Sequence, residues 1–164
     1  MKDFPYENLI PKIINLMNQS PLFPVFPMYF RGILLLTGMY TIAWSAIYRL
    51  MGDSILTWLA IGSEVNPELS LAYYGGFGIL VGLLIFFSSF YPISWVYLII
   101  AGISGKIILA IWFSLDFLPE IGWNKRTAFQ LIFNEILWLI PLIVVFLRGL
   151  QVKNYLMSKG EESA

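Results

Sequence analysis

Four long apolar segments constrain this chain more than any other feature of its sequence. They cover about residues 29–50, 69–87, 93–115 and 127–148. A helix needs about 20 predominantly apolar residues to cross the hydrocarbon core of a bilayer. Backbone N–H and C=O groups must be paired inside lipid, so such segments cross as helices. The sequence therefore predicts an all-α integral membrane protein, a four-helix bundle with short amphipathic segments at the membrane interface.

Shorter segments flank and interrupt the predicted bundle of residues 30–150. Residues 1–29 are amphipathic and punctuated by prolines, which favours an interfacial lead-in over a further span. Residues 53–61 are too short to cross and are expected on the membrane surface. Residues 151–164 are polar and predict a cytoplasmic tail. Since only 12% of the 164 residues are charged, about half the fraction typical of soluble domains, we expect no separate soluble domain.

The residue types that are missing exclude several kinds of chemistry. The chain has no cysteine, which excludes disulfides, thiolate metal sites and redox thiols. It has no histidine, the usual ligand of haem, zinc and copper and the commonest general base. Ten Lys and Arg balance ten Asp and Glu, so no basic field attracts nucleic acid. We therefore expect no metal, no cofactor, no catalytic residue and no nucleic-acid partner, which favours a non-enzymatic role.

Basic residues near the span ends predict the orientation in the membrane. An even number of spans places both termini on one side. The basic residues of that side are Lys2, Lys12, Arg31, Arg148, Lys153 and Lys159. Those of the other side are Arg49, Lys125 and Arg126. The excess predicts a multi-pass protein of a bacterial inner membrane with both termini in the cytoplasm.

Two ionisable residues, Lys106 and Glu135, lie deep in the third and fourth spans. A charge at the centre of a span costs about 3 kcal/mol on insertion scales. Lys106 lies about nine residues, and Glu135 about eight, from the outer end of its span, which at ~1.5 Å per residue puts both roughly 12–14 Å below the outer surface. The two charges are therefore level on antiparallel helices and can neutralise each other. The sequence does not fix the helix faces, so a contact, direct or through Asn134 or water, stays open.

Asn134, Tyr40 and Trp138 complete the predicted polar site inside the membrane. Tyr40 belongs to a weakly polar stripe of the first span, and Asn134 and Trp138 to a semi-polar stripe beside Glu135. Pro141 lacks a backbone N–H and predicts a kink in the same stripe. Three interpretations of the site remain open: a structural clasp that sets helix register, a polar cavity that binds a small molecule or relays protons, and a contact with a lipid headgroup or a partner subunit.

Small residues at four-residue spacing predict where helices approach closely. They are Gly78 and Gly82 in the second span and Ala101 and Gly105 in the third. Such pairs allow two backbones to approach each other in lipid. They serve packing within one chain more often than dimerisation, although exposed glycine faces would favour a partner.

The same region contains two short motifs. The third span has Gly-x-x-Gly-Lys at Gly102, Gly105 and Lys106, and the fourth has Phe-Asn-Glu-x-x-Trp-x-x-Pro at residues 133–141. Both resemble motifs of a group of small bacterial four-helix membrane proteins that is broadly DoxX-like. Members of that group often have aspartate after the asparagine, so Glu135 is a conservative departure. Further similar residues are Arg31, Gly38, Tyr40, Trp44, Pro92 and Trp95.

Three functions fit these observations. The favoured one is an accessory or scaffold subunit of a membrane complex, with the bilayer and a membrane protein or a second copy as partners. The second is a small transporter or proton-coupled carrier that uses the buried pair. The third is a lipid- or quinone-binding membrane subunit of a redox partner, which is the most that a DoxX-like resemblance implies. A peroxidase-like activity, also attributed to some members of that group, would need a thiol that this chain does not have.

Overall fold

The computed structural model describes residues 25–61 and 70–162, with side chains up to Lys159. Within these ranges every regular element is a helix, which confirms the all-α class. Most of the predicted lead-in, residues 1–24, lies outside the described residues.

Four helical segments are long and apolar enough to cross a membrane by their length and composition. The first two are the single helices α2 (Met28–Leu50) and α4 (Leu71–Ser88). The third combines α5 (Val96–Trp112), the π-helix η1 (Phe113–Phe117) and α6 (Leu118–Ile121). The fourth combines α7 (Lys125–Phe129), the π-helix η2 (Gln130–Ile136) and α8 (Leu137–Glu162). The chain thus has the spans of a multi-pass membrane protein.

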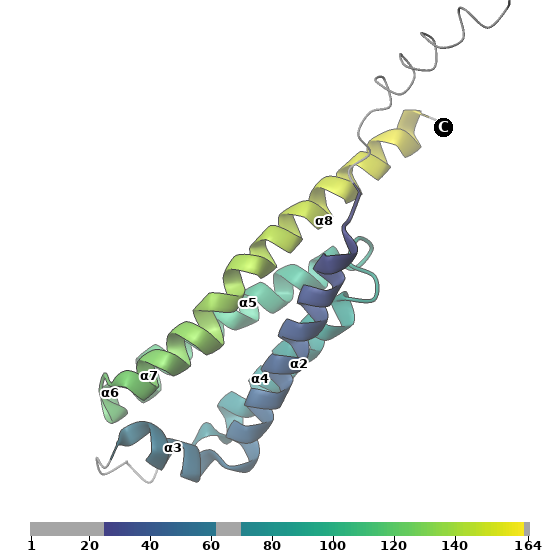
Figure 1. Cartoon of the computed structure of the whole chain (residues 1–164). Helices are drawn as coiled ribbons and strands as arrows, with labels where there is room; N and C mark the ends of the chain where they lie inside the picture. Colours follow the sequence, from purple (N-terminus) through teal and green to yellow (C-terminus); the bar gives the residue numbers. More distant parts are fainter. Residues whose placement is uncertain (1–24, 62–69, 163–164) are drawn as a thin grey trace, which may run out of the picture.

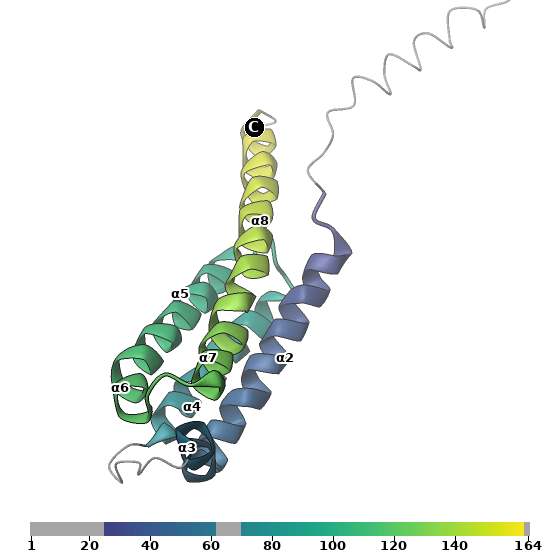
Figure 2. The same ribbon diagram turned by 60° about the vertical axis from the view of Figure 1, so that its left-hand side comes forward.

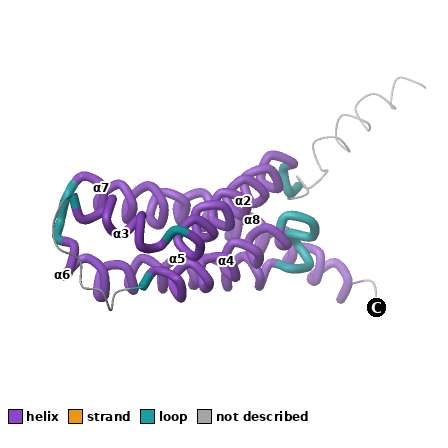
Figure 3. The backbone as a smooth tube through the Cα atoms, turned by 90° about the horizontal axis from the view of Figure 1, so that it is seen from below, coloured by secondary structure: helices purple, strands orange, loops and turns teal. Residues whose placement is uncertain are grey.

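The four spans run side by side and form a bundle with two ends (Figures 1 and 2). The start of α2 and the end of α8 lie at one end, called here the terminal end. The short helix α3 (Gly52–Ala60) lies at the opposite end with α6 and α7. Seen from below, α3 lies across the ends of the long helices (Figure 3). The short segment expected after the first span, residues 53–61, thus corresponds to α3.

The most extensive helix contact among the described residues joins α2 to α4, and glycines make it. A Cβ atom at Gly75 would lie 2.6 Å from the backbone nitrogen of Arg49, and one at Gly82 would lie 2.8 Å from that of Ile42. Gly78 likewise contacts the side chain of Ser45. The predicted small pair of the second span thus packs within the chain.

The third span packs on α4 through a different pair of small residues than expected. Gly105 contacts Val81, and Gly102 contacts Ile85. Ala101, predicted as the partner of Gly105, is exposed instead, because it lies one residue away from the buried face of α5. The glycines that make these helix contacts in both spans are therefore buried by contacts within the chain and present no exposed face.

A side-chain cap fixes where the fourth span begins. The Asn124 side chain accepts hydrogen bonds from the backbone N–H groups of Arg126 and Thr127, and Thr127 Oγ1 accepts from the Asn124 N–H. This reciprocal capping box satisfies groups that a helix start leaves unpaired. Asn124 Nδ2 also donates to the carbonyl of Leu59 at 2.8 Å. The cap therefore ties the fourth span to α3 and sets the level of the residues that follow.

Candidate functional site

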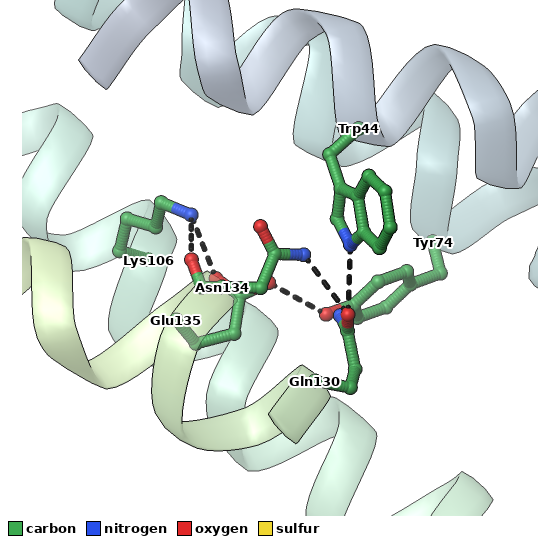
Figure 4. Close-up of polar contacts among 6 residues, drawn as sticks. All are labelled: Trp44, Tyr74, Lys106, Gln130, Asn134 and Glu135. Carbon is green, nitrogen blue, oxygen red and sulfur yellow. Dashed lines mark hydrogen bonds and ion pairs between the residues drawn. The ribbon is translucent and has the colours of Figure 1, made fainter. Parts of the chain in front are cut away.

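Lys106 and Glu135 form a direct ion pair in the interior of the bundle (Figure 4). Lys106 Nζ lies 3.0 Å from Glu135 Oε2, and the two side chains are 1% and 2% exposed. Lys106 Nζ also donates to the backbone carbonyl of Asn134 at 2.6 Å. Hydrogen bonds between charged groups of this kind offset the cost of removing both charges from water. The contact that the sequence left open is thus made without a bridging group.

Tyr74 binds the second oxygen of the same carboxylate. Its hydroxyl donates to Glu135 Oε1 at 2.9 Å, and the residue is 1% exposed. Sequence reasoning missed Tyr74, because a tyrosine near the start of a span is typical of the aromatic belt. One signal could have found it: Tyr74 and Gly78 are four residues apart and share one helix face, so the glycine stripe marks Tyr74 as buried.

A second group of polar side chains lies beside the pair. Trp44 Nε1 donates to Gln130 Oε1 at 2.8 Å, and Asn134 Nδ2 donates to the same oxygen at 3.2 Å. An indole N–H can only donate, so Gln130 must turn its oxygen towards Trp44. Asn134 must then turn its NH2 group towards Gln130, and its own amide oxygen points towards α2 (Figure 4). The Trp44 indole thus fixes the orientation of both amides.

Further close contacts join the two groups into one cluster. The Tyr74 hydroxyl lies beside the Gln130 side chain as well as against Glu135. The Tyr48 hydroxyl lies beside Trp44 and Asn134, outside hydrogen-bond geometry. The cluster therefore extends from Lys106 to Tyr48 and takes side chains from α2, α4, α5 and η2.

The π-helix η2 supplies three members of this cluster. Gln130, Asn134 and Glu135 are all buried. In an α-helix, the consecutive residues Asn134 and Glu135 would point about 100° apart. A π-helix bonds each N–H to the carbonyl five residues back, as Leu137 does with Ile132, and both consecutive residues are buried in it. The π turns end at Ile136, and Pro141, predicted to kink the fourth span, lies inside the α-helix α8 that follows.

Tyr40 and Trp138, the remaining predicted site residues, lie at the edge of the cluster. Their rings are 5.1 Å apart between centroids, and both residues are half-buried. In the described part of the chain, neither forms a hydrogen bond with Lys106 or Glu135. They pack α2 against α8 beside the polar cluster.

The described residues contain no group of three or more His, Cys, Asp or Glu side chains placed to bind a metal ion. Glu135 is the carboxylate at the centre of the cluster, and its neighbours are an ammonium group, hydroxyls and amides. This arrangement can hold a proton or hydrogen-bond a small polar molecule.

Comparison with models of known protein families, with curated proteins and with solved structures gave no match. The DoxX-like resemblance therefore rests on the short motifs alone, as does the lipid- or quinone-binding interpretation that it implies.

Proposed function

We propose that this protein is a small proton-coupled carrier, with Glu135 as the group that takes up and releases the proton. One observation carries the proposal: a single buried carboxylate joins three spans. Glu135 belongs to η2, and its two oxygens accept hydrogen bonds from Lys106 of α5 and from Tyr74 of α4. A change in the charge of this carboxylate therefore acts on three spans at once.

Protonation of Glu135 would alter the packing of these spans. It would neutralise the carboxylate and leave the Lys106 ammonium without its counter-charge in the membrane interior, where a lone charge is costly. Lys106 would then move towards water or lose its proton, and either event weakens the contact between α5 and η2. The state with the intact α5–η2 contact and the state with the weakened contact thus bind a proton with different affinity. Such a difference is required for proton binding to be coupled to a conformational change.

The rest of the cluster supports a functional site over a structural clasp. A clasp needs only the ion pair and its hydrogen bonds. Here the buried atoms Gln130 Nε2, Asn134 Oδ1 and the Tyr48 hydroxyl have no hydrogen-bond partner among the described residues. Each unpaired buried polar group costs about 1–3 kcal/mol. Apolar side chains at these positions would serve a clasp better, so the polar ones favour a role in binding.

Proton movement into proteoliposomes that contain only this chain tests the proposal. The vesicles hold a pH-sensitive dye, and a potassium diffusion potential drives protons inwards. We expect faster acidification than in empty vesicles, and we expect Glu135→Gln to return it to the empty-vesicle rate. Glu120→Gln is the matched control, because Glu120 is exposed and lies outside the cluster. Acidification by Glu135→Gln at the wild-type rate would overturn the proposal.

One observation favours a second function, that of an accessory subunit. The fourth span has 35 residues, about 52 Å of helix against a hydrocarbon core of about 30 Å. The end of α8 therefore extends past the other described helices (Figure 1), and it exposes Leu156 and Met157. A stoichiometric partner that co-purifies in mild detergent, and that is lost in Leu156→Asp, would support this function. The glycine faces of α4 and α5 do not support an accessory role, since they are buried within the chain.

A further inference from the structure

Three buried oxygens, two on α2 and one on η2, have no hydrogen-bond partner among the described residues. They are Asn134 Oδ1, Thr41 Oγ1 and Thr37 Oγ1, and their side chains are 3%, 2% and 0% exposed. The Asn134 oxygen cannot exchange places with its NH2 group, since Trp44 and Gln130 fix the amide. A buried acceptor and two buried hydroxyls are therefore left without a hydrogen bond by the described residues, and buried polar groups of native proteins are nearly always paired with protein or water.

Thr41 lies level with Asn134. Two contacts set the register of α2 against the fourth span: Tyr40 packs on Trp138, and Trp44 binds Gln130. Thr41 lies between Tyr40 and Trp44, while Asn134 lies midway between Gln130 and Trp138. The two unpaired groups consequently lie at the same height on facing helices.

The hydroxyls of Thr37 and Thr41 lie on the α2 face that meets the cluster. Thr37, Thr41, Trp44 and Tyr48 follow one another at helical spacing and share one face. The adjacent face of α2, which includes Gly38 and Ser45, contacts α4. The threonines therefore continue the face of Trp44 and Tyr48 towards the terminal end.

Lys106 supplies a donor at the same place. An ammonium group has three N–H donors, and the bonds to Glu135 and to the Asn134 carbonyl use two of them. Figure 4 shows Lys106 Nζ and Asn134 Oδ1 on the same side of η2. A water molecule there would accept from Lys106 and donate to Asn134 Oδ1 and Thr41 Oγ1. Three partners are the usual number for a buried water.

We propose that the space between Thr41, Asn134 and Lys106 binds water, and that this water, continued by Thr37, is the route by which a proton reaches Glu135. On the other side of the ion pair Tyr74 packs against Trp112 and Phe113, whereas Thr37 lies one helical turn from Thr41 in the direction of the terminal end. The route therefore leads from the ion pair towards the terminal end. The proton route rests on the proposed proton uptake at Glu135, whereas the water site does not.

The proton transfer balances without another reactant. Lys106 Nζ passes a proton to Glu135 Oε2 along the 3.0 Å hydrogen bond and takes one from the hydrated route. Lys106 ends as an ammonium group and Glu135 as a neutral carboxyl, so one proton has been gained.

Solid-state NMR of the full chain in lipid bilayers tests the water site through threonine labels. The sequence has four threonines: Thr37, Thr41, Thr57 and Thr127. Thr57 is exposed and reports bulk water. Thr127 is 0% exposed, and its hydroxyl is bonded to backbone groups of Gly122 and Asn124, so it reports a dry buried threonine. We expect magnetisation from water to reach Thr41 at least about fivefold faster than Thr127, as ordered buried water requires. Build-up at Thr37 and Thr41 as slow as at Thr127 would overturn the site.

Proton flux in proteoliposomes tests the route. Thr41→Val keeps the shape of the side chain and removes the hydroxyl, so we expect a loss of about tenfold in rate, with Thr41→Ser near wild type. Ser45→Ala is the control, since Ser45 faces α4, and its rate should be unchanged. A wild-type rate in Thr41→Val would overturn the route. If Thr41 is hydrated but the wild type carries no proton flux, the carrier function is refuted and the water site stands. If Thr41 is dry but the wild-type flux is normal, the water site is refuted and the carrier function stands.

Discussion

Tyr74 and Lys106 bind the two oxygens of one carboxylate from two different spans: the Tyr74 hydroxyl lies 2.9 Å from Glu135 Oε1, and Lys106 Nζ lies 3.0 Å from Oε2. Tyr74 belongs to α4, Lys106 to α5 and Glu135 to η2. The Glu135 carboxylate therefore connects α4 and α5 to η2. The charge of Glu135 and the arrangement of the three spans are thus linked.

The ion pair should behave as a coupled unit in stability measurements. Lys106→Met and Glu135→Gln each leave one buried charge or hydrogen-bonding group alone, and losing one partner of a buried pair typically costs about 3–5 kcal/mol. The double variant removes both charges, so it should recover much of that loss. Thermal unfolding in detergent completes the double-mutant cycle. Losses that simply add would show that the two residues do not interact.

Removal of the Tyr74 hydroxyl should destabilise the protein while its ring packing is kept. Tyr74→Phe gives up a hydrogen bond to a charged group, about 1.5–3 kcal/mol. Tyr73→Phe is the neighbouring control, because Tyr73 is 78% exposed. We expect a lower melting temperature for Tyr74→Phe only. Equal melting temperatures of the two variants would mean that the hydroxyl contributes nothing to the site.

The close approach of α2 and α4 should not tolerate a methyl group at Gly75. A Cβ atom there would lie 2.6 Å from the backbone of Arg49, and overpacking of this kind typically costs about 1–3 kcal/mol. Gly32→Ala is the matched substitution, since a Cβ at Gly32 has nothing within 4 Å and alanine favours a helix. Gly75→Ala should melt at a lower temperature and Gly32→Ala at the same or a higher one. The reverse order would contradict the packing.

Introduced cysteines can determine the orientation, because the chain has no cysteine of its own. Trp123 is exposed at the turn between α6 and α7, and Ser158 is exposed near the end of α8. If the termini are cytoplasmic, an impermeant maleimide should label Trp123→Cys in intact cells and Ser158→Cys only after permeabilisation. Labelling of both variants from the same side would be incompatible with four spans.

The spans and the ion pair were predictable because both depend on counting along the chain. Apolar length identifies a span, and equal distance from a shared loop places Lys106 and Glu135 at one level. The partners of Glu135 were harder to predict, since Tyr74 has the same local sequence character as a belt tyrosine. Asn134 and Glu135 are both buried in a π-helix, and the apolar pattern of the fourth span did not indicate where π turns would form.

The limits of the fourth span also differ from the prediction for a physical reason. Residues 151–164 were expected to form a polar tail beyond the bundle, and α8 continues to Glu162. Their polarity indicates water contact, but nothing between Gln151 and Lys159 breaks a helix, since neither proline nor glycine occurs there. Polarity thus does not predict the end of the helix.

Infrared difference spectroscopy tests most directly whether Glu135 takes up a proton in the intact protein. The carbonyl stretch of a protonated carboxyl group is recorded in bilayers as the pH is lowered and raised. We predict a reversible band that appears in the wild type and in Glu120→Gln and is missing in Glu135→Gln. A spectrum in which Glu135 stays a carboxylate at every pH that supports proton movement would contradict the account.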